Sequence, residues 1–443
     1  MKIGLLDHMG FGNLGDAATQ DALIANIRAR LPDADIVGFS LNPEDTRMRH
    51  HIVCYPITNW CPTLEDSSQL GIVEENPWSP IKSFLKKIPI LSPTASWIRN
   101  LLREVLHLGR SFTAVRSLDS LILSGGGQLC ELWRGPWSHP YNVFKFSLLT
   151  KLANRKLLLI NVGAGPLKSI LSKVFVGFSV RLADYVSFRD IESQVLVRGL
   201  GVKRQTHVFS DSVYSLDLSD IPARDAPKAT RPLVGINPMG FCDPRVWPTK
   251  DSSAYSRYLD KVEAFCLWLL KENYRVRFFS SDMSVDLYAL EDLKGRLERS
   301  LSPVEVAEVC VPPGTTVTAV LRQIAEFDFV VTAKFHGVVF SHLLAKPVIA
   351  LSYHHKIDDL MRAAGHSQYC LGIAGFDQQG LRRTFTALVE NASGLKQIFR
   401  RTTADYSGAL KIQFDELFTH PKLQSTIPQV TARNKDTVLD GSF

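Results

Sequence analysis

The chain opens with Lys2-Ile3-Gly4-Leu5-Leu6-Asp7, a short apolar run that stops at a glycine-rich loop and leads into a helical pattern over 17–31. Strand, loop and helix in this order are typical of a parallel sheet that helices cover on both faces. The alternation recurs at 35–39, at 120–123 before Gly125-Gly126-Gly127, and at 156–162 before Gly163-Ala164-Gly165-Pro166. The sequence therefore predicts an α/β domain over residues 1–220.

A second series of the same kind follows a segment near 217–231 that is rich in Asp, Pro, Ala and Lys, as domain linkers are. We expect strands at 232–237, 275–280, 327–332 and 347–351, and helices at 256–272, at 316–325 and after His336. The predicted fold is α/β, with two Rossmann-like domains, 1–220 and 221–422, and a cleft between them. The polar residues 423–443 are expected to form a flexible tail.

Residues 55–110 interrupt the first series. They show little period and contain three tryptophans and six prolines, Pro56, Pro62, Pro77, Pro80, Pro89 and Pro93. We expect an insertion or flap, and two interpretations of it remain open. It is either a lid beside the cleft or a loop with no catalytic role.

Residues 170–188 predict one amphipathic helix. Helical spacing places these apolar residues on one face: Leu171, Val174, Phe175, Phe178 and Leu182. We expect that face to pack on the sheet. With Lys173 and Arg181 as its only cations, the segment is less typical of a helix that lies in a membrane interface.

The bulk composition indicates a folded protein. Of 443 residues, 45% are hydrophobic and 21% are charged, which is ordinary globular usage. The formal net charge is +7, which favours small anionic ligands or contact with a membrane surface. Nucleic acid is not an expected partner, because no Lys/Arg-rich run with interleaved aromatic residues is present.

The seven cysteines are odd in number and include no Cys-x-x-Cys pair, so neither a disulfide framework nor a zinc site is expected. Residues 1–10 are too short and polar for a signal segment, and no apolar run reaches the roughly 18 residues that a spanning helix needs. These features predict a cytoplasmic protein, with peripheral contact at the inner face of the membrane compatible with its charge.

Three glycine loops are candidate substrate-binding segments. The first, at 10–16, has Gly-x-Gly-x-x-Gly spacing at the start of a helix, where backbone N–H groups favour an anion. The alternative is a tight turn capped by Asn13 or Asp16. Two interpretations also remain for the loops at 125–127 and 163–165. Their glycines allow either close approach of the backbone to a ligand or close packing of a helix on the sheet. The candidate residues of all three loops are Gly12, Asn13, Gly15, Asp16, Gly126, Gly127, Gly163 and Gly165.

Basic residues follow two strands of the second series. Lys334 and His336 come directly after 327–332, where an ammonium can hold an anion while an imidazole exchanges a proton. The strand 347–351 leads into Tyr353, His354 and Lys356, which lie on the same rim if the two strands are neighbours. No acidic or Cys partner stands at ligand spacing from these histidines, so we expect no metal.

Arg189 follows a short strand of the first series. Its rigid fork of donors suits a carboxylate or a phosphate. The alternative is a surface ion pair with the next residue, Asp190.

Taken in order, these motifs resemble the polysaccharide pyruvyl transferase family from residue 1 to about 359. The residues that carry the resemblance are Gly12-Asn13-Leu14-Gly15-Asp16, Ser124-Gly125-Gly126-Gly127, Val162-Gly163-Ala164-Gly165-Pro166, Ser187-Phe188-Arg189-Asp190, Asp211-Ser212-Val213, Lys334-Phe335-His336-Gly337, and 345–353.

The resemblance implies a fold of the GT-B type, a phosphoenolpyruvate donor, a glycan or lipid-linked sugar acceptor, and no metal or other cofactor. It also implies that Arg189 holds the donor and that His336 is the general acid. The chain departs from the family at Lys334, where the usual motif is Arg-Leu-His. A lysine at this position offers a single point charge to the donor's anionic groups, whereas an arginine would bind them through two parallel hydrogen bonds.

The expected activity is therefore transfer of an enolpyruvyl group from phosphoenolpyruvate to a sugar diol as a pyruvate ketal, in exopolysaccharide or cell-envelope synthesis. An imidazolium and fixed cations provide the proton and the charge neutralisation that this chemistry needs. Two alternatives stay open: a glycosyltransferase that uses a nucleotide sugar, and an inactive family member that binds glycan.

Overall fold

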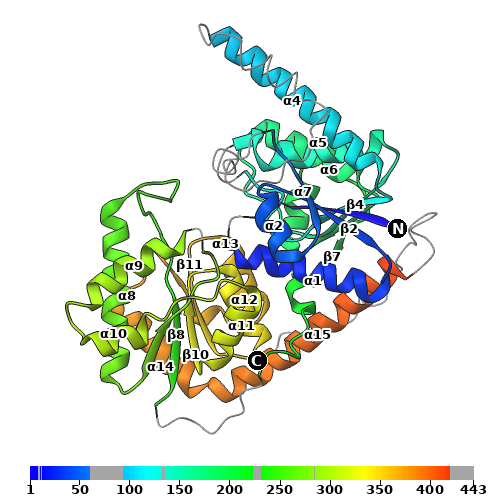
Figure 1. Cartoon of the computed structure of the whole chain (residues 1–443). Coiled ribbons are helices and arrows are strands. Elements are labelled where there is room, and N and C mark those ends of the chain that lie inside the picture. The colour runs from blue at the N-terminus through cyan, green and yellow to red at the C-terminus, as the bar shows by residue number, and fades with distance from the viewer. Residues whose placement is uncertain are drawn as a thin grey trace.

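The computed structural model describes residues 1–7, 10, 12–59, 93–131, 135–222, 231–283 and 285–419. Within them the chain forms two parallel sheets, each covered by helices (Figure 1). This arrangement confirms the predicted α/β fold with two Rossmann-like units. The predicted tail at 423–443 and most of the predicted insertion lie outside the described residues.

The first sheet has seven parallel strands in the order β3-β2-β1-β4-β5-β6-β7. Its strands are β1 (Lys2–Leu6), β2 (Asp35–Ser40), β3 (Val53–Pro56), β4 (Ser120–Ser124), β5 (Lys156–Val162), β6 (Tyr185–Phe188) and β7 (His207–Val208). Its helices are α1 (Leu14–Arg30), α2 (Pro43–His50), α4 (Pro93–Arg116), η2 (Gly135–Trp137), α5 (His139–Leu152), α6 (Ile170–Leu182), α7 (Ile191–Arg198) and η3 (Ser212–Ser215).

The second sheet has five parallel strands in the order β12-β11-β10-β8-β9. Its strands are β8 (Leu233–Asn237), β9 (Arg275–Phe278), β10 (Phe329–Thr332), β11 (Val348–Ser352) and β12 (Cys370–Gly372). Its helices are α8 (Ser252–Lys271), α9 (Asp286–Leu297), α10 (Pro303–Val309), α11 (Val317–Glu326), α12 (Phe335–Leu343), α13 (His355–Ala363), η4 (Ser367–Tyr369), α14 (Gln378–Glu390) and α15 (Ala392–Phe418).

Both sheets reverse their strand order once, between β1 and β4 in the first and between β8 and β10 in the second. Open α/β sheets bind ligands beyond the carboxyl ends of the strands near such a reversal. The strand ends that carry the predicted site residues therefore lie at the edges where a ligand is expected.

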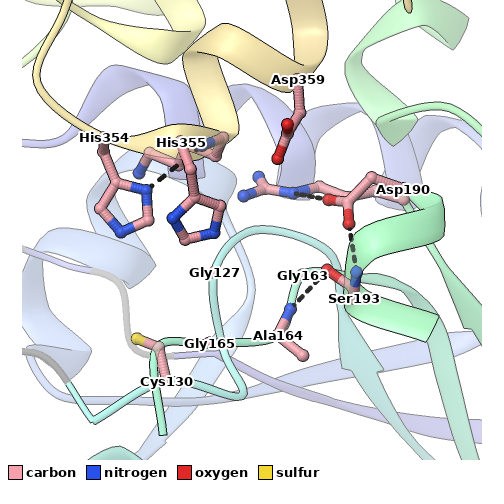
Figure 2. A pocket seen from close by; sticks show the side chains of 12 residues that line it. Gly127, Cys130, Gly163, Ala164, Gly165, Asp190, Ser193, His354, His355 and Asp359 are labelled. Atoms are coloured by element: carbon pink, nitrogen blue, oxygen red, sulfur yellow. Dashed lines mark hydrogen bonds and ion pairs between the residues drawn. The ribbon is translucent and has the colours of Figure 1, made fainter. Parts of the chain in front are cut away.

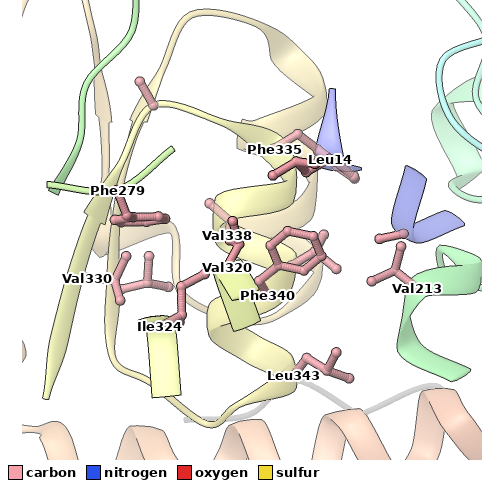
Figure 3. Close-up of a cluster of buried hydrophobic side chains, with 14 of the residues drawn as sticks. Leu14, Val213, Phe279, Val320, Ile324, Val330, Phe335, Val338, Phe340 and Leu343 are labelled. Atoms are coloured by element: carbon pink, nitrogen blue, oxygen red, sulfur yellow. The ribbon is translucent and has the colours of Figure 1, made fainter. Parts of the chain in front are cut away.

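One apolar core continues from the second unit into the first. The same buried cluster contains Phe335 and Phe340 of α12, Leu14 of α1 and Val213 of η3 (Figure 3). All four side chains are at most 8% exposed. The two units are thus joined by packed hydrophobic side chains in this structure.

Helix α15 crosses from the second unit back to the first sheet (Figure 1). Gln413, which is buried, donates to the Asn161 side-chain carbonyl at 2.9 Å and to the Tyr185 hydroxyl at 3.0 Å. Near its end, Asp415 pairs with Arg30 of α1 at 2.7 Å. A helix that begins on the second unit therefore contributes polar contacts to the first.

Within the predicted insertion over 55–110, α4 starts at Pro93 and projects from the first unit (Figure 1). A proline in the first helical turn removes only an N–H that has no helical partner. Pro93 therefore marks a helix start rather than an interruption.

The predicted helix at 170–188 ends at Leu182, and β6 follows at Tyr185. The face expected to pack on the sheet is also wrong, since Val174 and Phe178 are exposed. The buried residues are instead Ser172, Phe175, Val176, Gly177, Ser179 and Val180. Because α6 is apolar around most of its circumference, periodicity alone does not select one face.

Candidate functional site

A pocket lies where the strand ends of the two units meet (Figure 2). The first unit contributes Gly127, Cys130, Gly163, Ala164, Gly165, Arg189, Asp190 and Ser193, and the second contributes His354, His355, Lys356 and Asp359. The free volume is about 30 Å³, which holds one or two water molecules. The pocket in this state therefore encloses less space than a small organic ligand fills.

Arg189 is the arginine of the pocket wall. Its side chain is nearly buried, with Nη1 3.4 Å from Oδ2 of Asp211 and Nε 3.5 Å from Oδ2 of Asp190. The guanidinium lies 4.4 Å from the ring centroid of Phe335, in the second unit, which adds a cation–π contact. Arg189 is therefore more than a surface partner of Asp190.

Gly163 makes room for this arginine. A Cβ atom at residue 163 would lie 2.6 Å from Nε of Arg189, so the guanidinium would have to shift. The glycine thus lets the guanidinium of Arg189 pack directly on the backbone of the loop after β5.

His336 approaches the same carboxylate from the second unit. Its Nε2 lies 3.9 Å from Oδ2 of Asp211, and among the described residues it has no hydrogen-bond partner. Burial lowers the pKa of His336 to about 4, against a smaller opposing effect of Asp211. The imidazole is therefore neutral at pH 7 in the ligand-free protein. His336 is not among the residues that line the pocket.

Lys334 is neutralised within the protein. Its Nζ lies 2.9 Å from Oδ2 of Asp282 and 2.9 Å from Oδ1 of Asp286. Burial disfavours the ammonium, but the two carboxylates outweigh it and raise the pKa of Lys334. This differs from the expectation that Lys334 grips an anion of the substrate, because its charge is already satisfied.

The first glycine loop is closed by the protein itself, in agreement with the tight-turn interpretation. The Asn13 side chain caps α1 by accepting from the backbone N–H groups of Gly15 and Asp16 at 3.0 and 3.3 Å. Gly12, at φ 76°, accepts from the backbone of Met283 in the second unit at 2.8 Å. The loop thus connects the two units through its backbone.

Asp16 is half-buried at the start of α1 and accepts from the side-chain amide of Asn13 at 2.9 Å. Burial raises its pKa to about 6, although Lys356 acts in the opposite direction. A carboxyl that titrates near neutral pH therefore lies close to the cations of the pocket.

The other two glycine loops pair with each other. The Gly163 N–H donates to the Gly126 carbonyl at 2.7 Å, and Gly165 N–H donates to the Leu129 carbonyl at 2.8 Å. Gly126 has φ 73°, the left-handed region that glycine adopts without strain. Of the predicted loop residues, Gly127, Gly163 and Gly165 line the pocket.

On the opposite wall, Lys356 and His354 line the pocket, and His354 caps α13 by accepting from the Lys356 N–H at 3.3 Å. Burial lowers the pKa of His354 to about 3. Tyr353 instead packs its ring edge-on against Trp247, with centroids 5.4 Å apart. The residues predicted to bind substrate that lie outside the pocket wall are Gly12, Asn13, Gly15, Asp16, Gly126, Lys334 and Tyr353.

Sequence reasoning gave no role to Asp211, the carboxylate on which the site converges. It is buried and its Oδ1 accepts from the Val213 N–H at 3.1 Å, so Oδ2 is left to face Arg189 and His336. A carboxylate just after the short strand β7 was the available signal.

In the part of the chain that the structure describes, no group of three or more His, Cys, Asp or Glu side chains is arranged to hold a metal ion. A search of the same residues for a helix long and apolar enough to cross a membrane also finds none.

Solved structures share the fold over nearly the whole chain. The Anabaena protein HepE in complex with UDP gives a TM-score of 0.53 at 14% identity, covering 94% of this chain and 98% of its own. Staphylococcus aureus MnaA with UDP gives 0.56 at 11%, covering 96% of each chain. The Neisseria meningitidis UDP-GlcNAc 2-epimerase bound to UDP-GlcNAc gives 0.55 at 12%, covering 95% and 100%.

These likenesses confirm the predicted GT-B-like fold. A search of curated proteins finds no match. The family model for polysaccharide pyruvyl transferase matches residues 13–355, which include all the motifs from Asn13 to Tyr353. The chain therefore belongs to the polysaccharide pyruvyl transferase family and is a transferase.

Proposed function

We propose that this protein transfers the enolpyruvyl group of phosphoenolpyruvate to two hydroxyls of a sugar, in a polysaccharide or a lipid-linked glycan precursor. The observation that carries the proposal is the convergence of Arg189 and His336, from different units, on Oδ2 of Asp211 beside a pocket that also contains Lys356. The carboxylate and the phosphate of phosphoenolpyruvate can bind to Arg189 and Lys356, and its methylene carbon can accept a proton from His336.

The reaction balances without a cofactor. A proton adds to the methylene carbon of the donor, and an acceptor hydroxyl bonds to the oxocarbenium carbon that results. The carbon–oxygen bond to phosphate then breaks, a second hydroxyl of the same sugar bonds to that carbon, and a cyclic ketal forms. One hydroxyl proton replaces the proton consumed, and the other leaves with inorganic phosphate.

Arg189 and Lys356 are the residues that we propose to hold the donor's anionic groups. Both line the pocket and both lie near the Phe335 ring, with Cζ of Arg189 4.4 Å and Nζ of Lys356 5.8 Å from its centroid. Fixed cations in a site with little water stabilise phosphate departure more than they do in bulk solvent. Lys334 is proposed to position this wall through Asp282 and Asp286.

His336 is proposed as the general acid. Its imidazole is neutral when the site is empty, because burial lowers its pKa to about 4. A donor with several negative charges next to Nε2 raises that pKa, since a nearby anion favours the imidazolium. Donor binding would thus protonate His336, once the two walls of the pocket have moved apart to admit the donor.

The test is phosphate release from phosphoenolpyruvate with a panel of sugar acceptors, with mass spectrometry of the products for the ketal. Wild type and His207→Gln, a control at a half-buried histidine stacked on Tyr185, are expected to release phosphate at similar rates. His336→Gln is expected to be at least about a hundredfold slower.

Full activity of His336→Gln would remove the proposed acid. Thermal stabilisation by UDP but not by phosphoenolpyruvate would replace the proposal with a nucleotide-sugar glycosyltransferase. Binding of phosphoenolpyruvate without product formation across the acceptor panel would favour an inactive family member.

A further inference from the structure

Helices α5 and α6, with the short helix η2, expose large apolar side chains on the outer side of the first unit. Ile170 is 81% exposed, Leu152 66% and Trp137 65%. Val174 and Phe178 continue the stripe of Ile170 along α6, four residues apart. We call the exposed surface of η2, α5 and α6 the α5–α6 face. Stable soluble surfaces rarely keep so many large apolar groups together.

Aromatic rings connect this face into one surface. Trp137 contacts the rings of Tyr141 and Phe175, with centroids 5.5 and 5.7 Å apart. Phe144 stacks on Phe175 at 5.0 Å and meets Phe178 edge-on at 6.3 Å. The exposed side chains are therefore the outer edge of a continuous seam between α5 and α6, not scattered residues.

The charge of the same segment has a single sign. Between Glu131 and Asp184 the sequence contains no Asp or Glu. Two of its cations already have partners, since Lys145 pairs with Glu104 at 3.2 Å and Lys151 with Asp184 at 2.8 Å. Lys168, by contrast, is exposed just before α6. Lys173 and Arg181 are exposed on α6, and the Arg181 guanidinium lies 5.9 Å from the Phe178 ring centroid. Exposed apolar residues among cations are typical of surfaces that meet anionic lipid.

We infer that the α5–α6 face docks on an anionic membrane surface. Trp137, Ile170, Val174 and Phe178 enter the headgroup region, and the exposed cations contact lipid phosphates, namely Lys168, Lys173 and Arg181. Charge complementarity favours this occupant over a second copy of the chain, because two such faces would bring like charges together. The sequence had favoured packing of this side of α6 on the sheet, but the structure buries another side.

The face adjoins the pocket. Gly165 of the pocket wall precedes Ile170 by five residues, a reach of at most about 18 Å along the chain. The Glu131 carboxylate fixes the intervening loop, accepting from the backbone of Lys168 and Ser169 at 2.7 and 2.8 Å. Docking would therefore hold the pocket near the bilayer, which suits a lipid-linked acceptor. That last step rests on the proposed function.

Co-sedimentation with vesicles tests the docking. Wild type is expected to bind vesicles of phosphatidylcholine with phosphatidylglycerol, to bind phosphatidylcholine alone weakly, and to be released by salt. The variant Ile170→Gln/Val174→Gln/Phe178→Gln is expected to bind at least about tenfold more weakly. The matched control is Ile398→Gln/Ile412→Gln, which changes exposed isoleucines of α15.

Equal vesicle binding by wild type and the triple variant would overturn the proposal. So would a wild-type dimer in light scattering that the triple variant converts to monomer, since a second copy would then cover the face. Phosphate release with a soluble sugar keeps the two proposals apart. The triple variant should retain this activity, whereas vesicle binding without any phosphate release by wild type would contradict only the proposed function.

Discussion

A Cβ atom on Gly15 of α1 would lie 1.8 Å from Nδ1 of His336 in α12. The first helix of one unit thus packs its backbone directly against the imidazole of the other. Two backbone hydrogen bonds flank this contact, from Leu14 to Ser281 at 2.9 Å and from Met283 to Gly12 at 2.8 Å. The position of His336 relative to Arg189 therefore depends on a glycine at residue 15.

Gly15→Ala should displace His336 and reduce activity. We expect loss of about 1–3 kcal/mol of unfolding free energy from overpacking, and at least about a tenfold loss of phosphate release. Urea unfolding and the phosphate assay measure both. Gly408→Ala is the control, because an added Cβ in α15 meets nothing within 4 Å and should stabilise by about 0.5–1 kcal/mol. An unchanged Gly15→Ala enzyme would contradict the close contact.

Lys334→Met should act through stability rather than through donor affinity. It leaves two carboxylates without their cation, a change that costs about 3–5 kcal/mol when a buried pair is broken. The loss should shrink at pH 5, because burial raises the pKa of Asp286 to about 6 and the acid can then be neutral. Unfolding curves at pH 7.5 and 5 test this. A raised KM for phosphoenolpyruvate with unchanged stability would restore Lys334 as a substrate ligand.

Arg189→Lys should weaken donor binding. A lysine keeps one charge but loses the fork that reaches Asp211 and Asp190 and the planar contact with Phe335. We expect the KM for phosphoenolpyruvate to rise by about tenfold to a hundredfold. Arg257→Lys, an exposed arginine of α8, is the matched control and should leave KM unchanged. Equal KM values for Arg189→Lys and wild type would exclude the proposed contact.

His336 should make wild type lose stability in acid. Its pKa is about 4 in the folded protein and 6.5 as the ordinary value, so below pH 6.5 the unfolded chain binds a proton that the folded chain does not. The stability is fully present above pH 6.5 and is lost as the pH falls toward 4. Relative to His336→Gln, wild type should lose about 2 kcal/mol between pH 7.5 and 5 in urea unfolding. Parallel pH profiles of the two proteins would contradict the burial of this imidazole.

The sequence predicted the alternation of strands and glycine loops because each strand is a short apolar run with a clear end. It also placed Arg189, His354 and Lys356 at strand ends that do line the pocket. The partners of Lys334 could not be predicted, since Asp282 and Asp286 come from a loop and a helix about fifty residues away. The role of Asp211 depends on how closely the two units approach, which no local pattern encodes.

Titration calorimetry of phosphoenolpyruvate in two buffers of different ionisation enthalpy tests the central claim most directly. If the donor binds between Arg189 and His336, binding at pH 7 should draw about one proton from the buffer in wild type and none in His336→Gln. Donor binding without proton uptake in wild type, or equal uptake in both proteins, would contradict the claim that His336 becomes protonated when the donor binds.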